Sequence, residues 1–332
     1  MKIMKFCFVA LVAITSCKSN EEKSIGTFDR IDPEFNSLVS ENAKVEIIAE
    51  GFKWSEGPVW VDQYNMLLFS DVPNNIIHKW TEEKGLETYL TPSGFSGTKS
   101  LSKEPGSNGL TLSKDGKLTL CQHGDRRVAL MNAPLDAPTP NFISIAANYN
   151  GKKFNSPNDA AYRSNGDIFI TDPPYGLPNQ ENDSTKETPY QGVYKASTDG
   201  KVTLLVDSLT RPNGIAFLPG EKTFIVANSD PAKAIWYAFD LAENDSVMNP
   251  RIFYNATSFT KEEKGLPDGF KVDKQGNIFA TGPGGIWVFN KEGKVLGKIK
   301  ITEPTSNCAL ANDDKTLFVT ANMYVLRIKL RE

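Results

Sequence analysis

Oxygen-bearing side chains recur along this chain at nearly even intervals. The recurring residues are Glu56, Asn108, Asn158, Asn213, Asp268 and Asn307, separated by 52, 50, 55, 55 and 39 residues. A single Asn or Asp before glycine is typical of a turn, but Glu56, Asn158, Asn213 and Asp268 together offer four oxygen donors and two negative charges. Hard divalent cations prefer such donors, whereas zinc prefers imidazole and thiolate. We therefore predict a metal site for Ca²⁺, or for another divalent cation, provided that the fold brings these residues together.

The segments that follow these residues have the pattern of β-hairpins. In each copy the polar residue leads into an apolar strand, a short turn and a second apolar strand. The turns are rich in Gly, Asn and Asp, which tolerate positive φ, as at residues 114–116 and 164–166. A further pair of β-rich segments fits between successive hairpins, which gives four strands per repeat.

Six such repeats predict an all-β fold, a six-bladed β-propeller with four antiparallel strands per blade. Residues 45–48 precede the first hairpin and residues 325–328 follow the last, so we expect the two chain ends to share one blade and close the ring. A β-sandwich and a seven-bladed ring are the alternatives, and no long stretch follows a helical period. Because equivalent positions of all blades lie on one circle in a propeller, the oxygen donors are expected to converge.

A second set of residues recurs about fifteen positions after the first, where the return strand regains the same end of the hairpin. Its members are Asp71, His123, Asp172, Asn228, Gly282 and Asn322. The chain contains only two histidines, His78 and His123. For His123 we weigh proton transfer or substrate binding equally against a structural hydrogen bond, whereas His78 is expected to be a packing or surface residue.

The first residues have the features of an export signal. Residues 1–16 combine a basic start with an apolar run too short to span a bilayer, and small residues directly precede Cys17. This arrangement resembles a bacterial lipoprotein signal that leaves Cys17 as the lipidated N-terminus, and an ordinary signal peptide is the alternative. We expect residues 17–40 to be a polar tether, residues 41–332 to form the propeller, and the protein to be exported and held to the membrane through its lipid only.

Charge and cysteine content exclude other classes. Removal of residues 1–16 takes away Lys2 and Lys5 and no acid, which moves the formal net charge from −3 to −5. An acidic chain without a basic run is a poor candidate for binding nucleic acid. The two remaining cysteines, Cys121 and Cys308, lack the spacing of a zinc site. They are expected to be buried thiols, with a disulfide as the alternative.

Several motifs resemble the family of senescence marker protein, gluconolactonase and luciferin-regenerating enzyme. The matching motifs are Glu56-Gly57-Pro58-Val59-Trp60, Ser156-Pro157-Asn158-Asp159, Arg211-Pro212-Asn213-Gly214 and Pro267-Asp268-Gly269. The residues around Asn108, and Asp172 with Tyr175, look like the bacterial gluconolactonase branch. The resemblance implies a metal held by Glu56, Asn213 and Asp268, with Asn158 at the metal or the substrate. Ser156 stands where the animal branch has a sugar-binding arginine, which leaves the substrate open.

This resemblance predicts a calcium-dependent hydrolase that opens sugar lactones by metal-assisted attack of water, with Asn108, Asn158, Asp172 and Tyr175 facing the substrate. Asp268 is the expected acid/base. His123 is the alternative acid/base, because the pKa of a histidine is better matched to neutral pH. The chain has no Gly-x-Ser-x-Gly elbow for a serine hydrolase. The rivals are an aryl-ester or organophosphate hydrolase on the same metal and a non-catalytic sugar-binding or scaffold propeller. Residues 177–189 are either a lid or a plain loop.

Overall fold

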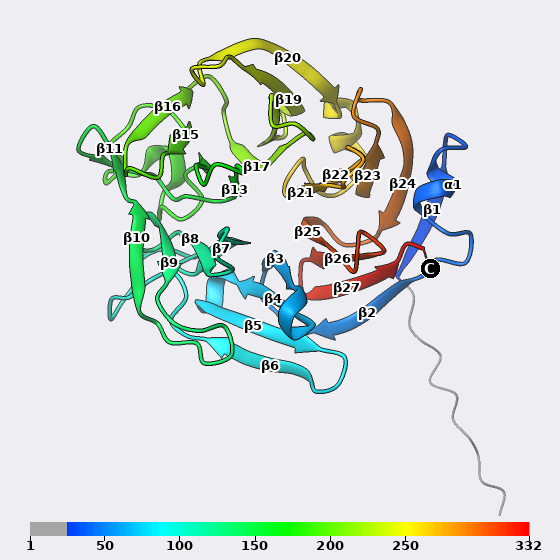
Figure 1. Ribbon diagram of the computed structural model, residues 1–332, viewed down its shortest axis with the longest axis horizontal. Coiled ribbons are helices and arrows are strands. Elements are labelled where there is room, and N and C mark those ends of the chain that lie inside the picture. Colours follow the sequence, from blue (N-terminus) through cyan, green and yellow to red (C-terminus); the bar gives the residue numbers. More distant parts are fainter. Residues whose placement is uncertain (1–24, 332) are drawn as a thin grey trace, which may run out of the picture.

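The strands of the protein form six antiparallel sheets around a common axis (Figure 1). The structure is a computed structural model that describes residues 25–331. The first blade comprises β3 (Ser55–Val61), β4 (Met66–Asp71), β5 (Ile76–Thr81) and β6 (Gly85–Leu90). The second comprises β7 (Ser107–Leu112), β8 (Leu118–Gln122), β9 (Arg127–Met131) and β10 (Phe142–Ala146). The third comprises β13 (Ala160–Tyr162), β14 (Ile168–Asp172), β15 (Gly192–Ala196) and β16 (Val202–Val206).

The remaining blades repeat this order. The fourth comprises β17 (Pro212–Phe217), β18 (Thr223–Asp230), β19 (Lys233–Leu241) and β20 (Val247–Asn255). The fifth comprises β21 (Phe270–Val272), β22 (Ile278–Gly282), β23 (Gly285–Phe289) and β24 (Val295–Ile301). The closing blade comprises β25 (Thr305–Ala311), β26 (Thr316–Ala321), β27 (Tyr324–Lys329) and β2 (Val45–Glu50). The predicted six-bladed propeller with four-stranded blades is therefore confirmed.

Short elements lie between the strands, both within blades and between them. They are the hairpin β11 (Asn148–Tyr149) and β12 (Lys152–Lys153), the helix α1 (Phe35–Leu38), and the 3₁₀ turns Asp62–Tyr64, Val72–Asn74, Gln180–Asn182 and Thr257–Lys261. Among the described residues, no helix has the length and apolar character needed to cross a bilayer.

The ring closes where both chain ends meet in one sheet, as predicted. β2 pairs antiparallel with β27, with Val45 opposite Ile328 and Glu46 opposite Arg327. The guanidinium of Arg327 donates to Glu46 at 2.7 Å, a cross-strand ion pair at this junction. Because β2 and β27 pair with each other, the edges that they turn toward one another carry no unpaired backbone groups.

The hydrophobic core is divided among the interfaces between neighbouring blades. Within the described residues, six clusters of buried apolar side chains occur, and each joins two adjacent sheets. Between the third and fourth blades, for example, the rings of Phe169 and Phe224 pack with centroids 5.4 Å apart and neither is exposed. Each blade is buried on both faces, which explains why its middle strands read as nearly continuous apolar runs.

The predicted tether ends earlier than residue 41. Residues Gly26–Arg30 form β1, a fifth strand that pairs with β24 on the outer edge of the fifth blade (Figure 1). The following helix α1 buries Phe35 fully, and its ring lies against Gly297, where a Cβ atom would come within 2.3 Å of the ring. Arg30 donates to the carbonyls of Val39 and Ser40 at 2.8 and 2.6 Å. A few apolar residues in a polar stretch thus suffice to dock residues 25–40; the predicted signal and Cys17 lie outside the described residues.

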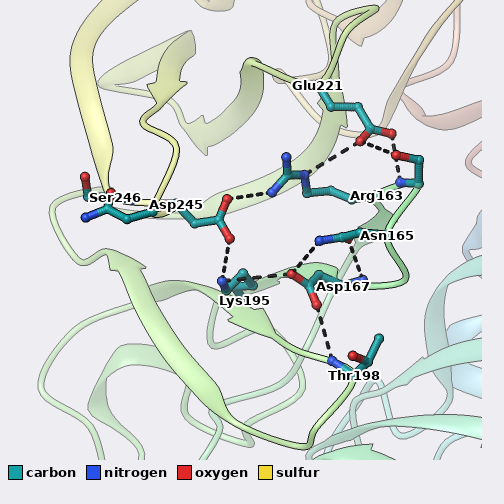
Figure 2. A network of polar contacts seen from close by, with 10 residues as sticks. Arg163, Asn165, Asp167, Lys195, Thr198, Glu221, Asp245 and Ser246 are labelled. Atoms are coloured by element: carbon teal, nitrogen blue, oxygen red, sulfur yellow. Dashed lines mark hydrogen bonds and ion pairs between the residues drawn. The ribbon is translucent and has the colours of Figure 1, made fainter.

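A polar network joins the third and fourth blades at the hairpin-turn end (Figure 2). Asp245 accepts from Arg163 at 2.6 Å and from Lys195 at 2.7 Å, while Glu221 accepts from the backbone and hydroxyl of Ser164. These groups lie around the turn between β13 and β14, whereas Asn158 precedes β13 and Asp172 ends β14. The network therefore stabilises the end of the blades opposite to the recurring oxygen donors.

Candidate metal and lactone site

The inner strands bring the recurring polar residues together at one end of the propeller. A pocket of about 310 Å³ is lined by Trp54, Glu56, Glu104, Asn108, Asn158, Tyr175, Arg211, Asn213, Ser229, Gly265, Leu266, Asp268, Pro304 and Thr305. Five of the six recurring oxygen donors line it. The sixth, Asn307, is not part of the lining, and its Oδ1 accepts from the ammonium of Lys271 at 3.2 Å.

A larger pocket of about 550 Å³ lies between the first and second blades. Its lining includes the charged residues Lys79, Glu82, Glu83 and Lys84. None of the buried, unpartnered side-chain atoms of the described residues belongs to its lining. Since a binding site is marked by polar groups that converge and lack partners, the smaller pocket is the candidate site.

Four oxygen atoms of this pocket have no hydrogen-bond partner among the described residues. They are the Oδ1 atoms of Asn108, Asn158, Asn213 and Asp268, and each is buried. Glu56 adds a fully enclosed carboxylate, of which Oε2 accepts from the backbone N–H of Gly57 at 2.8 Å. An unpartnered buried oxygen costs about 1–3 kcal/mol. Four at one place point to a bound group that supplies what the protein leaves unsatisfied.

Burial and neighbouring carboxylates disfavour the charged forms of both carboxyl groups of this set. Burial raises the pKa of Glu56, and the nearby Asp159 carboxylate adds to the shift. Burial likewise raises the pKa of Asp268 well above its usual range, with repulsion from Glu56 as the second cause. In a site of this kind a proton or a cation must compensate the second negative charge.

Glycines allow the inner strands to approach each other closely around the ring. A Cβ atom on Gly214, the residue after Asn213, would lie 2.3 Å from the carbonyl oxygen of Asp268. One on Gly109, the residue after Asn108, would lie 2.6 Å from the carbonyl oxygen of Asn158, to which the Gly109 N–H donates at 2.7 Å. At these two positions the glycine after the oxygen donor therefore sets the distance to the next blade's donor.

The second recurring set supports the first. Asp172 accepts from the backbone N–H groups of Asn155 and Ser156, both at 2.8 Å, and Asn228 accepts from the N–H of Arg211 at 2.8 Å. Asp71 accepts in the same way from residues 53 and 54. These side chains hold the loops that lead into Asn158, Asn213 and Glu56.

The predicted substrate role of Asp172 does not fit its position. Asp172 is fully buried beneath the loop that it holds and is not part of the pocket lining. The spacing that identified Asp172 is shared by all blades, and it describes the return strand rather than the pocket wall. Tyr175 does line the pocket, where its ring lies under the guanidinium of Arg211 at 5.8 Å and its hydroxyl donates to the carbonyl of Ser229.

His123 lies behind the pocket instead of in its wall. It is fully buried, its Nδ1 atom is 3.8 Å from Oε2 of Glu104, and neither ring nitrogen has a hydrogen-bond partner among the described residues. Burial lowers the pKa of His123 to about 4, so the imidazole is neutral at pH 7. His123 therefore reaches the site only through Glu104, a residue that the repeat pattern did not identify.

Two charged residues of the pocket lining escaped the sequence reasoning for different reasons. Glu104 comes from the connection between β6 and β7, and such connections differ in length from blade to blade, so they carry no repeat signal. Arg211 stands in a recognised motif, two residues before Asn213, but charge alone gave no reason to place it in the pocket. The Arg211 guanidinium binds Glu181 of the loop 177–189 at 2.7 Å, which ties that loop to the rim.

Comparison with known proteins identifies the family. The model of the SMP-30/Gluconolactonase/LRE-like region matches residues 54–323. The chain belongs to this family. It is 39% identical to a gluconolactonase of Zymomonas mobilis over 323 residues, covering 95% of this chain and 90% of that relative.

Solved structures of SMP-30/gluconolactonase-like proteins share the fold. A gluconolactonase from Xanthomonas campestris superposes with a TM-score of 0.79 at 27% identity, covering 92% of this chain and 95% of the other. A calcium-binding regucalcin from Agrobacterium tumefaciens superposes with a TM-score of 0.65 at 17% identity, covering 86% and 94%. The second likeness bears on the fold alone.

Proposed function

We propose that the protein is a calcium-dependent hydrolase that opens sugar lactones. The observation that carries the proposal is the group of four buried, unpartnered oxygens beside Glu56 in one pocket. The relatives named gluconolactonase supply the substrate class, a cyclic sugar ester. Attachment to a membrane through Cys17 belongs to the same proposal and rests on the sequence alone.

The donor chemistry fits calcium better than zinc. Glu56, Asn158, Asn213 and Asp268 offer only oxygen, and the described residues contain no group of three or more His, Cys, Asp or Glu placed to hold a metal. The set therefore depends on amide oxygens, which are ordinary ligands of Ca²⁺. Another divalent cation that accepts oxygen ligands satisfies the same geometry.

The residues of the pocket would contribute to lactone hydrolysis in different ways. A bound cation would polarise the lactone carbonyl and stabilise the negative charge that develops on its oxygen when water attacks. Asn108, together with Arg211, offers hydrogen bonds to the hydroxyl groups of the sugar, and Trp54 and Tyr175 offer ring surfaces at the pocket wall. Asp268 belongs to the metal ligands in this scheme, and a cation beside its carboxylate makes that group a weaker base.

Turnover of a lactone panel tests the proposal. Gluconolactone and related aldonolactones should be hydrolysed above the spontaneous rate, with loss of activity in chelator and in the variant Asp268→Ala. Aryl esters and a phosphotriester in the same pH-stat assay represent the competing hydrolases. If only those compounds turn over, the lactone assignment is wrong and the metal mechanism stands; if none does, the protein is a binding propeller.

A further inference from the structure

The pocket contains a carboxyl group that the metal does not need. Five of its lining residues can carry charge, namely Glu56, Glu104, Tyr175, Arg211 and Asp268. Glu56 and Asp268 belong to the proposed ligand set. Burial raises the pKa of Tyr175 above its usual range, and the Arg211 guanidinium is always protonated, so neither accepts a proton near neutral pH. Glu104 is the carboxyl group left in the described lining.

Backbone hydrogen bonds between the segment before β7 and the turn after β8 hold the residues next to Glu104 at the pocket. The segment before β7 pairs with the turn after β8, because His123 N–H donates to the carbonyl of Gly106 and Gly124 N–H donates to that of Pro105, each at 3.2 Å. Glu104 directly precedes Pro105 in this segment. A third of its side chain remains exposed, and it lines the pocket, so the carboxyl group can meet a substrate there.

His123 fills the space behind Glu104. Gly176 covers the other side of His123. A Cβ atom at position 176 would lie 2.6 Å from Cβ of His123, so only glycine fits at that position. The enclosed imidazole keeps two unpartnered nitrogens, with Nδ1 3.8 Å from the Glu104 carboxylate. At 3.8 Å the pair is not hydrogen-bonded in this structure. A hydrogen bond would form if the two atoms approached by about 0.6 Å, and it would satisfy one buried nitrogen and stabilise the carboxylate.

We propose that Glu104 is the catalytic acid/base of the lactone hydrolysis and that His123 is its positioning residue. The inference rests on the proposed function and assigns a residue of that site. In the first step the Glu104 carboxylate accepts a proton from water as the water oxygen bonds to the lactone carbonyl carbon. In the second step the bond from that carbon to the ring oxygen breaks, and the ring oxygen takes the proton back from Glu104. The products are the open-chain hydroxy acid and an unchanged Glu104.

The variant Glu104→Gln tests the first assignment, because it keeps size and polarity and removes basicity. We expect kcat to fall by about 100-fold or more, the usual contribution of a general base, while KM and calcium affinity stay within about threefold. Glu104→Asp keeps a carboxylate on a shorter chain and should retain more activity than Glu104→Gln. The matched control is Glu83→Gln, which removes the same charge from an exposed turn of the first blade and should leave kcat unchanged.

The pH profile tests the role of His123. The groups that face the Glu104 carboxyl are Glu56, Asp268, Tyr175, Arg211 and His123. Loss of a neutral N–H donor disfavours the carboxylate, so His123→Phe should move the acidic limb of kcat/KM to higher pH, and His123→Gln, which restores a donor, should move it partly back. A merely structural histidine would lower the unfolding temperature and leave the limb in place.

The outcomes separate this inference from the proposed function. If the wild-type protein hydrolyses lactones with calcium and Glu104→Gln keeps kcat within about threefold, Glu104 is not the acid/base and the function stands. If Glu104→Gln loses calcium affinity as severely as activity, Glu104 is a metal ligand, and the inference is overturned in that way. If the wild-type protein opens no lactone, the proposed function fails first.

Discussion

Replacement of Gly214 by alanine should damage the site far more than the fold. The added Cβ atom would lie 2.3 Å from the carbonyl oxygen of Asp268 and 2.8 Å from Cα of Gly269. Both are backbone atoms, which cannot rotate out of the way. Since Cβ atoms essentially never approach other heavy atoms within 3.0 Å, one of the two inner strands must move by about 0.7 Å. Overpacking of this kind costs about 1–3 kcal/mol of stability.

The displaced strands carry Asn213 and Asp268, two of the proposed metal ligands. A shift approaching 1 Å at a reacting centre costs about 100-fold in rate, so we expect Gly214→Ala to lose about that factor in kcat and much of its calcium affinity. Gly220→Ala is the control within the same hairpin. Gly220 has open space around it and a φ of +89°, so alanine there costs roughly 1 kcal/mol through backbone strain alone.

Calorimetric titration of calcium, lactone turnover per folded molecule and thermal unfolding should be measured on both variants. Both should unfold at lower temperature than the wild type, and only Gly214→Ala should lose calcium binding and activity. If the two variants bind calcium equally well, the close approach of the inner strands does not set the ligand positions, and the argument from these glycines is wrong.

Two further predictions concern the docked N-terminal segment and the charge of the site. Phe35→Ala should lower the free energy of unfolding by about 3–5 kcal/mol because Phe35 is fully buried, whereas Ile31→Ala, at a residue 60% exposed, should change it by about 0.5 kcal/mol or less; equal losses in urea unfolding would contradict the docking of residues 25–40. Burial raises the pKa of Glu56 to about 8 in the metal-free protein, so calcium must displace a proton below that pH. Calcium affinity should therefore weaken as the pH falls from about 8 to about 6, with proton release detectable by calorimetry in two buffers, and a pH-independent affinity would remove Glu56 from the ligand set.

The repeat pattern predicted the fold because each blade presents the same physical problem. A strand next to the axis must begin with a polar residue and then continue as an apolar run, so this signal appears six times. In four of the six repeats a glycine follows the polar residue and allows a close approach to the neighbouring blade. Residues that belong to this cycle, such as Glu56, Asn213 and Asp268, could be placed from spacing alone. The closing pair of β2 and β27 followed from the same logic, since one blade lacked an outer strand.

The predicted site residues were wrong or incomplete where a residue's role depends on burial rather than on spacing. Asp172 and His123 occupy the predicted register but end beneath loops, where they hold backbone or a side chain instead of meeting a ligand. Glu104 lies in a connection whose length differs from blade to blade, and β1 is an extra strand of the fifth blade alone, so the repeat pattern identified neither. A residue of the pocket wall and a residue that supports the wall differ in position by only a few ångströms. A sequence repeat of about fifty residues shows which part of the blade a residue belongs to, but it does not show on which side of the wall its side chain lies.

The position of the positive charge in the pocket bears on the substrate. Ser156, which stands where the animal branch has an arginine, is fully buried; its hydroxyl donates to the carbonyl of Pro173 at 2.6 Å and accepts from the N–H of Gly176 at 2.9 Å. An arginine would not fit there, because its charge would lie inside the turn that covers His123. Arg211 instead supplies a guanidinium from the next blade, two residues before Asn213. A sugar bound by this guanidinium would therefore meet its positive charge one blade further round the ring than the position of Ser156.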